Sequence, residues 1–393
     1  MRVKQNLSDF VRQADLVLLG LCTASTLFGI LVIASATRHT GSNKFVVVQS
    51  LGMLLGILFY FLLSAVDVED LPQKWKWILG FNVVLFLLLR TPLGVSVNGN
   101  RAWLGPQTIG KMLGISALAS FPMTVQPAEV VKITYTILLA WQLAKLREER
   151  DLKAFGNVIQ PVAHMIFMVG LLYAMSRDAG SALVYVMIFA GMSFAAGMAL
   201  RWFAIGGAAA AGGFWAMWHF ELLPSHMRSR IAVLFDHELD PMGAGWHQGR
   251  SILALGSGQV TGQGLFNGTQ TQSSYSSSLP ERYNDFIFSA VGEEMGMIGC
   301  ILVLILLSAI VLRCFMIAYS AKTAMSSYVC VGMASMLLFQ ILANIGMCLY
   351  VMPVIGLTLP FFSYGGTSIL MMYMAMGIVS GIKTRSLPDW LRT

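Results

Sequence analysis

Long apolar segments recur along this 393-residue chain, separated by shorter polar ones. A helix needs roughly 20 residues to cross about 30 Å of hydrocarbon. Apolar segments of suitable length occupy residues 14–36, 44–66, 75–91, 126–146, 155–175, 180–200, 202–221, 285–312, 325–350 and 363–383. The pattern predicts an all-α polytopic membrane protein with about ten transmembrane helices in a single domain, residues 1–393.

Composition agrees with this pattern, since 56% of the residues are hydrophobic and only 11% are charged. Such a balance is typical of integral membrane proteins and excludes an ordinary soluble domain. The N-terminal segment is amphipathic and charged, and no small-residue cleavage site follows the first apolar segment. We therefore expect the first span to be retained and not removed as a signal peptide.

An even number of spans places both termini on the same side of the membrane. Lysine and arginine are enriched on the cytoplasmic side of membrane proteins. The basic residues that this topology groups with the termini are Arg2, Lys4, Arg12, Lys74, Lys76, Lys145, Arg147, Arg150, Lys153, Arg201, Arg313, Lys322, Lys383, Arg385 and Arg392. Both termini are therefore expected in the cytoplasm, with two long loops, residues about 92–125 and 222–284, outside.

The two long loops are also basic, although the charge rule predicts no excess of cations on an external face. Their basic residues are Arg101, Lys111, Arg228, Arg230, Arg250 and Arg282. One interpretation is that they bind an anion. The other is that long loops escape the charge rule and carry ordinary solvated arginines, and the sequence leaves both open.

Cysteine and histidine give little sign of a disulfide or a metal site. The five cysteines fall within or at the ends of predicted spans and are expected to act as small apolar packing residues. His219, His226, His237 and His247 gather around the second long loop beside acidic residues, so a metal site is conceivable there. No pair of them has the spacing of a zinc motif, and structural or incidental histidines are the favoured interpretation.

A glycine-rich stretch runs from Gly256 to Gly268. Its glycine spacing fits neither the dinucleotide-binding turn nor the Gly-Lys-Ser/Thr phosphate loop. The favoured interpretation is a loop at the membrane edge whose glycines allow close backbone packing. Backbone donors that bind a pyrophosphate remain an alternative.

An acidic residue lies where a polar loop enters an apolar span. The sequence Leu279-Pro-Glu-Arg-Tyr-Asn-Asp285-Phe-Ile-Phe288 places Glu281, Arg282 and Asp285 at that junction. A carboxylate in such a position costs free energy to hold and is a functional candidate. The alternative role of Asp285 is to cap the N-terminus of the following helix, and both roles can coexist.

Other charged residues fall inside predicted spans. Glu129 and Lys132 lie three residues apart on one helix, so they can face and neutralise each other, or they can line a cavity open to the outside. Glu293 and Glu294 cannot both face lipid, so at least one is expected to point into the bundle. Helical spacing places Glu293 nearer to the Asp285 face.

Several motifs together resemble the SEDS family (shape, elongation, division and sporulation), which includes RodA and FtsW. The matching segments are Asn98-Gly-Asn-Arg-Ala-Trp103-Leu, Gln126-Pro-Ala-Glu129-Val-Val-Lys132, Asp178-Ala-Gly-Ser-Ala-Leu-Val-Tyr, Gly256-Ser-Gly, Phe266-Asn-Gly-Thr-Gln-Thr-Gln272, Leu279-Pro-Glu through Gly296, Asn344-Ile-Gly-Met and Pro353 through Ser368. The Leu-Pro-Glu and Ser-Tyr-Gly-Gly segments are the most specific, and the resemblance covers most of the chain.

The resemblance implies a peptidoglycan glycosyltransferase of the bacterial cytoplasmic membrane that polymerises lipid II at its outer face. A class B penicillin-binding transpeptidase would be its partner, alongside membrane lipids and without nucleic acid. The stretch from Phe266 to Gln272 looks more like RodA, which favours cell elongation over division or sporulation. A lipid II flippase is the alternative function, because charged residues inside spans are compatible with a transport route. A scaffold is ranked last.

The resemblance also implies site residues. Asp285 matches the aspartate on which polymerase activity depends, and a carboxylate there can act as the general base. The residues expected to bind substrate are Trp103, Arg101, Lys111, Glu129, Lys132, Arg250, Glu281, Arg282 and Ser363. No metal ligand and no certain cofactor follow, with a divalent cation left as an alternative.

This chain departs from the family pattern at four places, one of which is the segment from Ser273 to Ser278, which is longer than usual. Asn100-Arg101-Ala102-Trp103 stands where Ala-Arg-Arg-Trp is usual, Ala128 replaces a serine, and Asn284 replaces the threonine before the aspartate. Only one basic residue then remains beside Trp103. Any role of a second falls to Lys111 or another loop.

Overall fold

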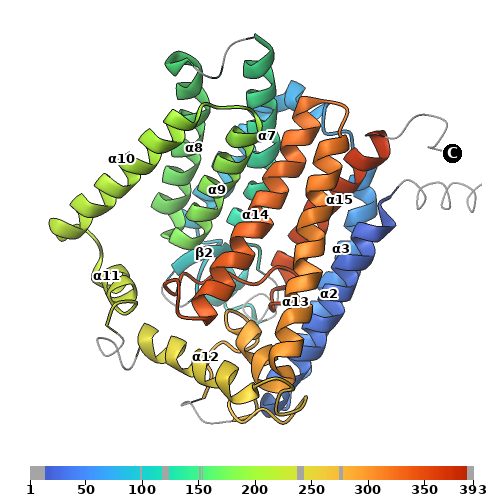
Figure 1. The fold of residues 1–393 in the computed structure, drawn as a ribbon, viewed down its shortest axis with the longest axis vertical. Helices are drawn as coiled ribbons and strands as arrows, with labels where there is room; N and C mark the ends of the chain where they lie inside the picture. Colours follow the sequence, from blue (N-terminus) through green and yellow to red (C-terminus); the bar gives the residue numbers. More distant parts are fainter. Residues whose placement is uncertain are drawn as a thin grey trace, which may run out of the picture.

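The computed structural model describes residues 14–97, 100–116, 124–149, 152, 154–236, 243–273 and 278–386. Every predicted span coincides with a helix in a bundle of roughly parallel and antiparallel helices (Figure 1). These helices are α2 (Leu16–Ala36), α3 (Lys44–Ser64), α4 (Trp75–Leu87), α7 (Pro127–Glu149), α8 (Phe155–Ser176), α9 (Ala179–Ala195), α10 (Leu200–His219), α13 (Ile287–Ser320), α14 (Ala324–Cys348) and α15 (Gly366–Ser386).

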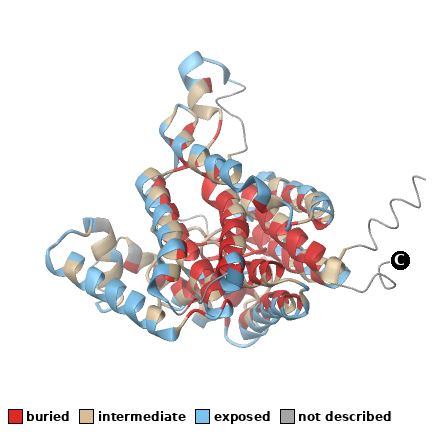
Figure 2. Ribbon diagram, turned by 90° about the horizontal axis from the view of Figure 1, so that it is seen from above, coloured by how far each residue is buried: buried red, intermediate tan, exposed pale blue. Residues whose placement is uncertain are grey.

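Within the described residues, six helices are long and apolar enough to cross a membrane: α2, α3, α8, α13, α14 and α15. The chain is therefore a multi-helix membrane protein with several apolar spans, as the hydrophobic pattern predicts. Burial is concentrated on the facing sides of the central helices, whereas the periphery presents exposed side chains (Figure 2). Helix α10 leans away from the bundle and has no buried residue (Figure 1).

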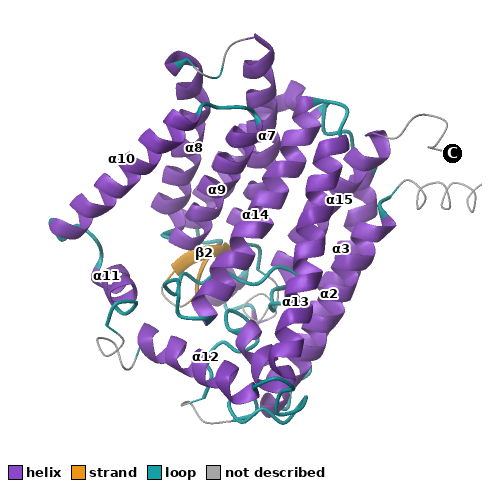
Figure 3. Cartoon of the chain, viewed as in Figure 1, coloured by secondary structure: helices purple, strands orange, loops and turns teal. Residues whose placement is uncertain are grey.

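Both long loops contain secondary structure (Figure 3). The first holds an antiparallel pair of strands that the hydrophobic pattern did not predict, β1 (Gly94–Val97) and β2 (Asn100–Leu104), followed by α5 (Gln107–Leu113). The second holds α11 (Ser225–Ala232) and α12 (Ala244–Gly258), which connect α10 to the start of α13. Short strands are weak sequence signals beside apolar spans of 20 residues or more, which explains why the pattern missed them.

Helix α13 is interrupted near its start, which the predicted span 285–312 did not anticipate. Gly296 has φ 65° and ψ −162°, a conformation that glycine adopts readily. The backbone groups freed by this break bond to the preceding loop: Gln263 N donates to Glu293 O at 2.9 Å, and Met297 N donates to Gln259 O at 2.9 Å. Irregular backbone at membrane depth is tolerated when protein covers it in this way.

The glycine-rich stretch packs closely against α13, as its composition predicted. A Cβ atom at Gly258 would lie 1.8 Å from the carbonyl oxygen of Gly292, and one at Gly262 would lie 2.2 Å from that of Glu294. Only glycine allows the two backbones to approach so closely. The alternative in which this stretch binds a phosphate is not needed to explain its glycines.

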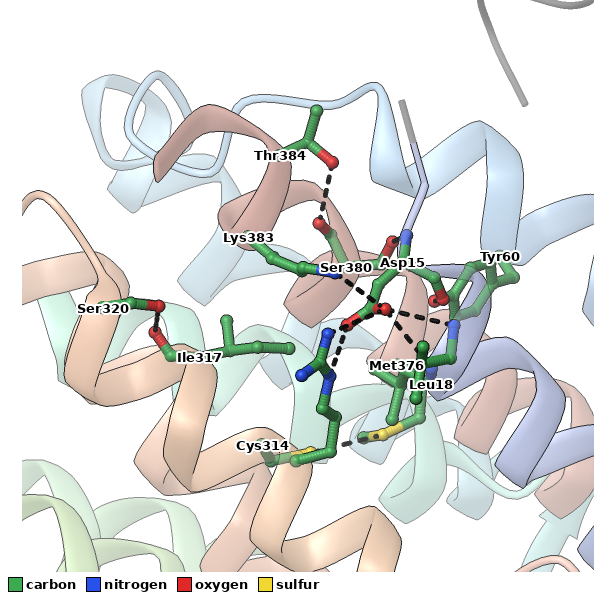
Figure 4. Close-up of polar contacts among 12 residues, drawn as sticks. Asp15, Leu18, Tyr60, Cys314, Ile317, Ser320, Met376, Ser380, Lys383 and Thr384 are labelled. Atoms are coloured by element: carbon green, nitrogen blue, oxygen red, sulfur yellow. Dashed lines mark hydrogen bonds and ion pairs between the residues drawn. The ribbon is translucent and has the colours of Figure 1, made fainter. Parts of the chain in front are cut away.

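The described ends of the chain meet at one end of the bundle, where a buried carboxylate ties four helices together (Figure 4). Asp15 accepts hydrogen bonds from Arg313 of α13 at 2.8 Å and from Lys383 of α15 at 3.0 Å. Tyr60 of α3 donates to its carbonyl oxygen at 2.8 Å. Burial alone would raise the pKa of Asp15, but these two cations hold that pKa below its ordinary value.

We call this end the Asp15 end. Asp285 precedes α13, while Arg313 lies 16 residues beyond Met297 on the uninterrupted part of that helix, which corresponds to about 24 Å at 1.5 Å per residue. Asp285 therefore lies at the opposite end of the bundle, which we call the Asp285 end.

Substitution of Gly258 tests the close packing of α12 on α13. We expect Gly258→Ala to destabilise the protein by about 1–3 kcal/mol, because the new methyl group meets the backbone of Gly292 and cannot be relieved by a side-chain rotation. The measurement is the thermal unfolding midpoint of the purified protein in detergent.

Gly256→Ala is the matched control, since it lies on the same helix and a Cβ atom there meets nothing within 4 Å. Equal midpoints for the two variants would contradict the close approach.

Candidate functional site

Asp285 lies in the turn that precedes α13, with its side chain half-buried. The residue at the N-cap position of α13 is Phe286, and no side chain forms a capping hydrogen bond there. The interpretation of Asp285 as a helix cap is therefore wrong. The predicted span starts too early, because the chain turns at Asp285 and becomes helical only at Ile287.

The backbone of Asp285 is fixed by a side chain from α14. Asn344 Nδ2 donates to the carbonyl oxygen of Asp285 at 2.8 Å and to that of Leu357 at 2.7 Å. One buried amide thus joins the segment before α13 to the segment before α15. Asn344 is in one of the motifs that carry the family resemblance, but its role was not predicted.

The carboxylate of Asp285 has no hydrogen-bond partner among the described residues, in contrast to its backbone. Gly356 lies opposite, and a Cβ atom on it would be 3.8 Å from Asp285 Oδ2. Gly356 has φ +69°, so a larger residue would be strained there, whereas the contact itself would be an ordinary van der Waals distance. Gly356 is therefore required by the backbone turn that faces the carboxylate.

The surroundings of Asp285 favour the protonated form of its carboxyl group. Burial, and then the negative charges of Glu281 and Asp178, raise the pKa of Asp285 to about 7 against a lowering by Arg230. A carboxyl group with this pKa is partly ionised at neutral pH and can both take up and release a proton. Of the residues predicted to bind substrate, Glu281 is the one whose charge acts on Asp285.

The turn that contains Ser363 fastens the segment in front of Asp285. Ser363 Oγ donates to the carbonyl oxygen of Asn284 at 2.7 Å and accepts from Leu359 N at 2.8 Å. Tyr364 N donates to the carbonyl oxygen of Tyr283 at 2.9 Å. The hydroxyl group of Ser363 is therefore buried and engaged with backbone, so its contact with a substrate remains a prediction that the geometry does not favour.

Arg282 is also engaged by the protein. Its Nη1 atom donates to the carbonyl oxygens of Gln270 and Ser273, each at 2.8 Å, and its Nη2 atom lies 2.8 Å from His39 Nε2. With 6% of its surface exposed, the residue holds the loop in front of α13 in place. This geometry does not present the guanidinium group to a ligand.

Glu293 and Glu294 are both buried at the start of α13, and both hold the loop that precedes it. Glu293 accepts from the backbone of Gln270 at 2.6 Å and of Thr271 at 2.7 Å. Glu294 accepts from Ser35 of α2 at 2.6 Å and from Gln272 at 2.8 Å. We call these contacts the glutamate latch. The carboxylate oxygens of both residues accept hydrogen bonds from protein donors. These bonds explain how two carboxylates are tolerated at membrane depth.

Glu129 and Lys132 form the ion pair that their spacing predicted, with Lys132 Nζ 2.7 Å from Glu129 Oε1. Both side chains are buried, and Glu129 Oε2 has no hydrogen-bond partner within the described ranges. Beside them Gln126 Nε2 donates at 3.2 Å to Asp178, which also caps α9. The charge of Asp178 acts on Asp285, so the pair lies in the neighbourhood of the candidate site.

The remaining predicted binding residues lie on the loops of the Asp285 end without a recorded contact to Asp285. Arg101 donates to the carbonyl oxygen of Thr91 at 2.8 Å, and Trp103 pairs with Val95 across the two strands. Lys111 is exposed on α5, and Arg250 lies 5.5 Å from the ring centre of Trp246. Their roles in binding stay predictions.

The cysteines of this chain serve as packing residues. The five cysteines are free, and four of them are fully buried as packing residues, which confirms the expectation from their positions. In the portion of the chain that the structure describes, no group of three His, Cys, Asp or Glu residues could hold a metal ion. His237 lies outside that portion.

Fold and site together define a polytopic membrane protein with a carboxyl group, at one end of its helical bundle, that has no hydrogen-bond partner in the part of the chain described by the structure. The profile of the FtsW/RodA/SpoVE family, described as cell cycle proteins, matches residues 12–387. The chain therefore belongs to the FtsW/RodA/SpoVE family, and the resemblance to SEDS proteins is confirmed.

Two relatives represent different branches of this family. The peptidoglycan glycosyltransferase MrdB of Escherichia coli is 30% identical, and the match covers 86% of this chain and 87% of MrdB. A probable peptidoglycan glycosyltransferase FtsW of Pasteurella multocida is also 30% identical, with coverage of 96% and 94%. Sequence identity does not separate the two branches.

Solved structures show the same fold. A chain from a study of polymerization and crosslinking by a peptidoglycan synthase complex superposes with a TM-score of 0.77 at 27% identity, covering 96% of this chain and 99% of the other. The rod shape determining protein RodA of Thermus thermophilus superposes with a TM-score of 0.67 at 25% identity, with coverage of 96% and 98%.

Asn344→Ala tests whether one amide fixes the site. We expect a loss of about 2–4 kcal/mol in unfolding free energy, because two backbone carbonyl groups lose their donor and each buried unpaired group costs about 1–3 kcal/mol. Chemical or thermal unfolding in detergent measures this loss. Ser327→Ala on the same helix is the control, and a loss no greater than the control's would show that Asn344 is not needed to hold the turn.

Proposed function

We propose that this protein is a peptidoglycan glycosyltransferase that polymerises lipid II, with Asp285 as its general base. The observation that carries the proposal is the state of Asp285: its carboxylate has no hydrogen-bond partner among the described residues, and burial raises its pKa to about 7. The names of MrdB and FtsW support the same activity.

The chemistry follows from these properties. The acceptor sugar hydroxyl attacks the anomeric carbon of the donor, the new glycosidic bond forms, and the bond to the lipid pyrophosphate breaks. The ionised carboxylate of Asp285 takes the proton of the attacking hydroxyl, and the pyrophosphate leaves with the electron pair of the broken bond. A rigid backbone and a free side chain suit this role, since catalytic groups gain most from fixed placement.

Cations are needed where the pyrophosphate develops charge. Arg230 is the cation whose charge reaches Asp285, and no ion pair or hydrogen bond to it is recorded among the described residues. We propose Arg230 for this role, ahead of Arg282, whose donors are engaged. Arg101, Lys111, Arg250 and Trp103 are kept as binding residues on the surrounding loops.

The proposed topology has ten spans in the cytoplasmic membrane, both termini in the cytoplasm, and the Asp285 end outside. The distribution of basic residues supports it, because Lys145, Arg147, Arg313, Lys383 and Arg385 all lie at the Asp15 end. In this orientation the site faces the side on which a cell wall is built. A single domain over the whole chain agrees with this topology.

We further propose that the protein works with a crosslinking class B penicillin-binding transpeptidase, as the synthase complex of the similar structure suggests. Cell elongation is the proposed setting. It rests on the stretch from Phe266 to Gln272, which looks more like RodA than FtsW. A flippase has less support, since the glutamate latch and the Glu129–Lys132 pair engage the charges that a transport route would need.

Asp285→Asn tests the catalytic role. We expect glycan polymerisation from lipid II to fall by about 10²–10⁴-fold, because an amide of the same shape cannot accept the hydroxyl proton. The measurement is strand formation by the purified protein with its cognate transpeptidase. Asp70→Asn, an exposed change at the Asp15 end, is the control for effects of purification and reconstitution. If Asp285→Asn forms as much glycan strand as the native protein, Asp285 is not the general base. If the native complex forms no strands, the flippase function is favoured instead.

The pH dependence of polymerisation tests the electrostatic environment of Asp285. A general base acts when deprotonated, so the rate should rise with pH through about 7. Glu281→Gln removes a charge that raises the pKa of Asp285 and should move this rise to lower pH. Arg230→Gln removes a charge that lowers it and should move the rise to higher pH. Identical profiles for all three proteins would rule out Asp285 as the titrating group.

A further inference from the structure

A cavity of about 590 Å³ lies between α4, α7 and α8 in the half of the bundle nearer the Asp15 end. Its walls come from the first turns of α4, the last turns of α7 and the first half of α8. It is therefore separated from Asp285 by most of the membrane thickness. Neither the proposed catalysis nor the family resemblance gives it a role.

The lining of this cavity changes from charged to apolar with depth. Glu149 and Lys145 lie at its outer edge, half-exposed and 3.9 Å apart. Gln142 lies one turn further in on α7, and Leu138 another turn beyond. From Glu149 to Leu138 the helix descends by about 16 Å at 1.5 Å per residue. A phospholipid changes from headgroup to acyl chain in the same direction.

The middle of the cavity is lined by neutral polar side chains. His164 of α8 bonds through Nδ1 to Gln142 Oε1 at 3.0 Å, and both residues line the cavity. They separate its charged edge from its apolar depth, as the ester groups of a phospholipid separate the headgroup from the acyl chains.

Two tryptophans form the side of the cavity near its edge. Trp75 and Trp141 stack with ring centres 6.0 Å apart, and Lys145 Nζ lies 5.8 Å from the ring centre of Trp141. Tryptophan is favoured at the level of lipid headgroups, where its ring contacts both apolar and polar groups. Indole faces also attract cations such as an ammonium group.

We propose that this cavity binds one zwitterionic phospholipid with an ammonium headgroup, drawn from the leaflet at the Asp15 end. Lys145 binds its phosphate, Glu149 binds its ammonium group, and the polar pair Gln142–His164 lies at the level of its ester groups. One acyl chain lies against Leu138 and Phe167. Charge complementarity selects this occupant, because the edge carries one cation and one carboxylate and would repel a purely anionic headgroup at Glu149.

The test is lipid retention by the purified full-length protein. The protein is reconstituted in nanodiscs of equal parts phosphatidylethanolamine and phosphatidylglycerol, released, and examined by native mass spectrometry. We expect one retained phosphatidylethanolamine, preferred over phosphatidylglycerol by about tenfold, which corresponds to about 1.4 kcal/mol. Equal retention of the two lipids, or none, would overturn the proposal.

Two variants with matched controls locate the lipid. Leu138→Trp fills the deep part of the cavity and should abolish retention, whereas Ile305→Trp on the exposed face of α13 should not. Glu149→Gln should reduce the preference for phosphatidylethanolamine without changing the fold, and the exposed neighbour Glu148→Gln should leave it unchanged. If Leu138→Trp does not fold, the comparison of Glu149→Gln with Glu148→Gln tests the site by itself. A lipid preference that stays unchanged in Glu149→Gln contradicts the proposed site.

Discussion

The structure depends on one constraint at Asp285. Its backbone is held in place, while its side chain is left without a hydrogen-bond partner among the described residues. Asn344 and Ser363 bind the carbonyl groups of Asp285 and Asn284, while the carboxylate of Asp285 makes no hydrogen bond with any residue that the structure describes. Had the same donors reached the carboxylate, they would have stabilised its charge and lowered its pKa. Burial is the main cause of the raised pKa of Asp285, and no hydrogen bond from the described residues acts against it.

The interruption of α13 serves the same constraint. In an unbroken helix the backbone N–H and C=O groups around Gly296 would bond to one another. None of them would then be available to bond to the loop in front of the helix. The break at Gly296 frees backbone groups that bind residues 259–264, and the glutamate latch binds residues 266–272 just beyond. Arg282 then joins that loop to the turn that carries Asp285. A chain of contacts thus runs from the membrane helix to the site, and none of its members needs to touch a substrate.

The two ends of the bundle use carboxylates in opposite ways. At the Asp15 end, Asp15 is saturated with donors from α13 and α15 and serves to hold helices together. At the Asp285 end, Asp285 is left without them. The difference lies in the neighbours, since the residue type is the same. Two cations approach Asp15 within hydrogen-bond distance, whereas Glu281 and Asp178 place like charges around Asp285.

The sequence by itself determined the class of protein, the positions of the helices and the candidate aspartate. Long apolar segments have few alternatives to helices in a membrane, because every backbone group must find a partner within the segment. It also predicted the Glu129–Lys132 pair, since a spacing of three residues fixes which side chains are neighbours on a helix. The small sheet in the first long loop and the break at Gly296 were not predicted, because both depend on backbone partners far away along the chain.

Only the tertiary structure decided what the polar residues of the site do. Arg282 and Ser363 look like ligand-binding residues in the sequence, yet both bind protein backbone, and Asp285 does not cap a helix. Asn344, Gly356 and Arg230 gained their roles near Asp285 through contacts or charges that cross 55 or more residues of sequence. Local patterns record which residues are present, whereas hydrogen bonding and burial depend on which distant segments pack together.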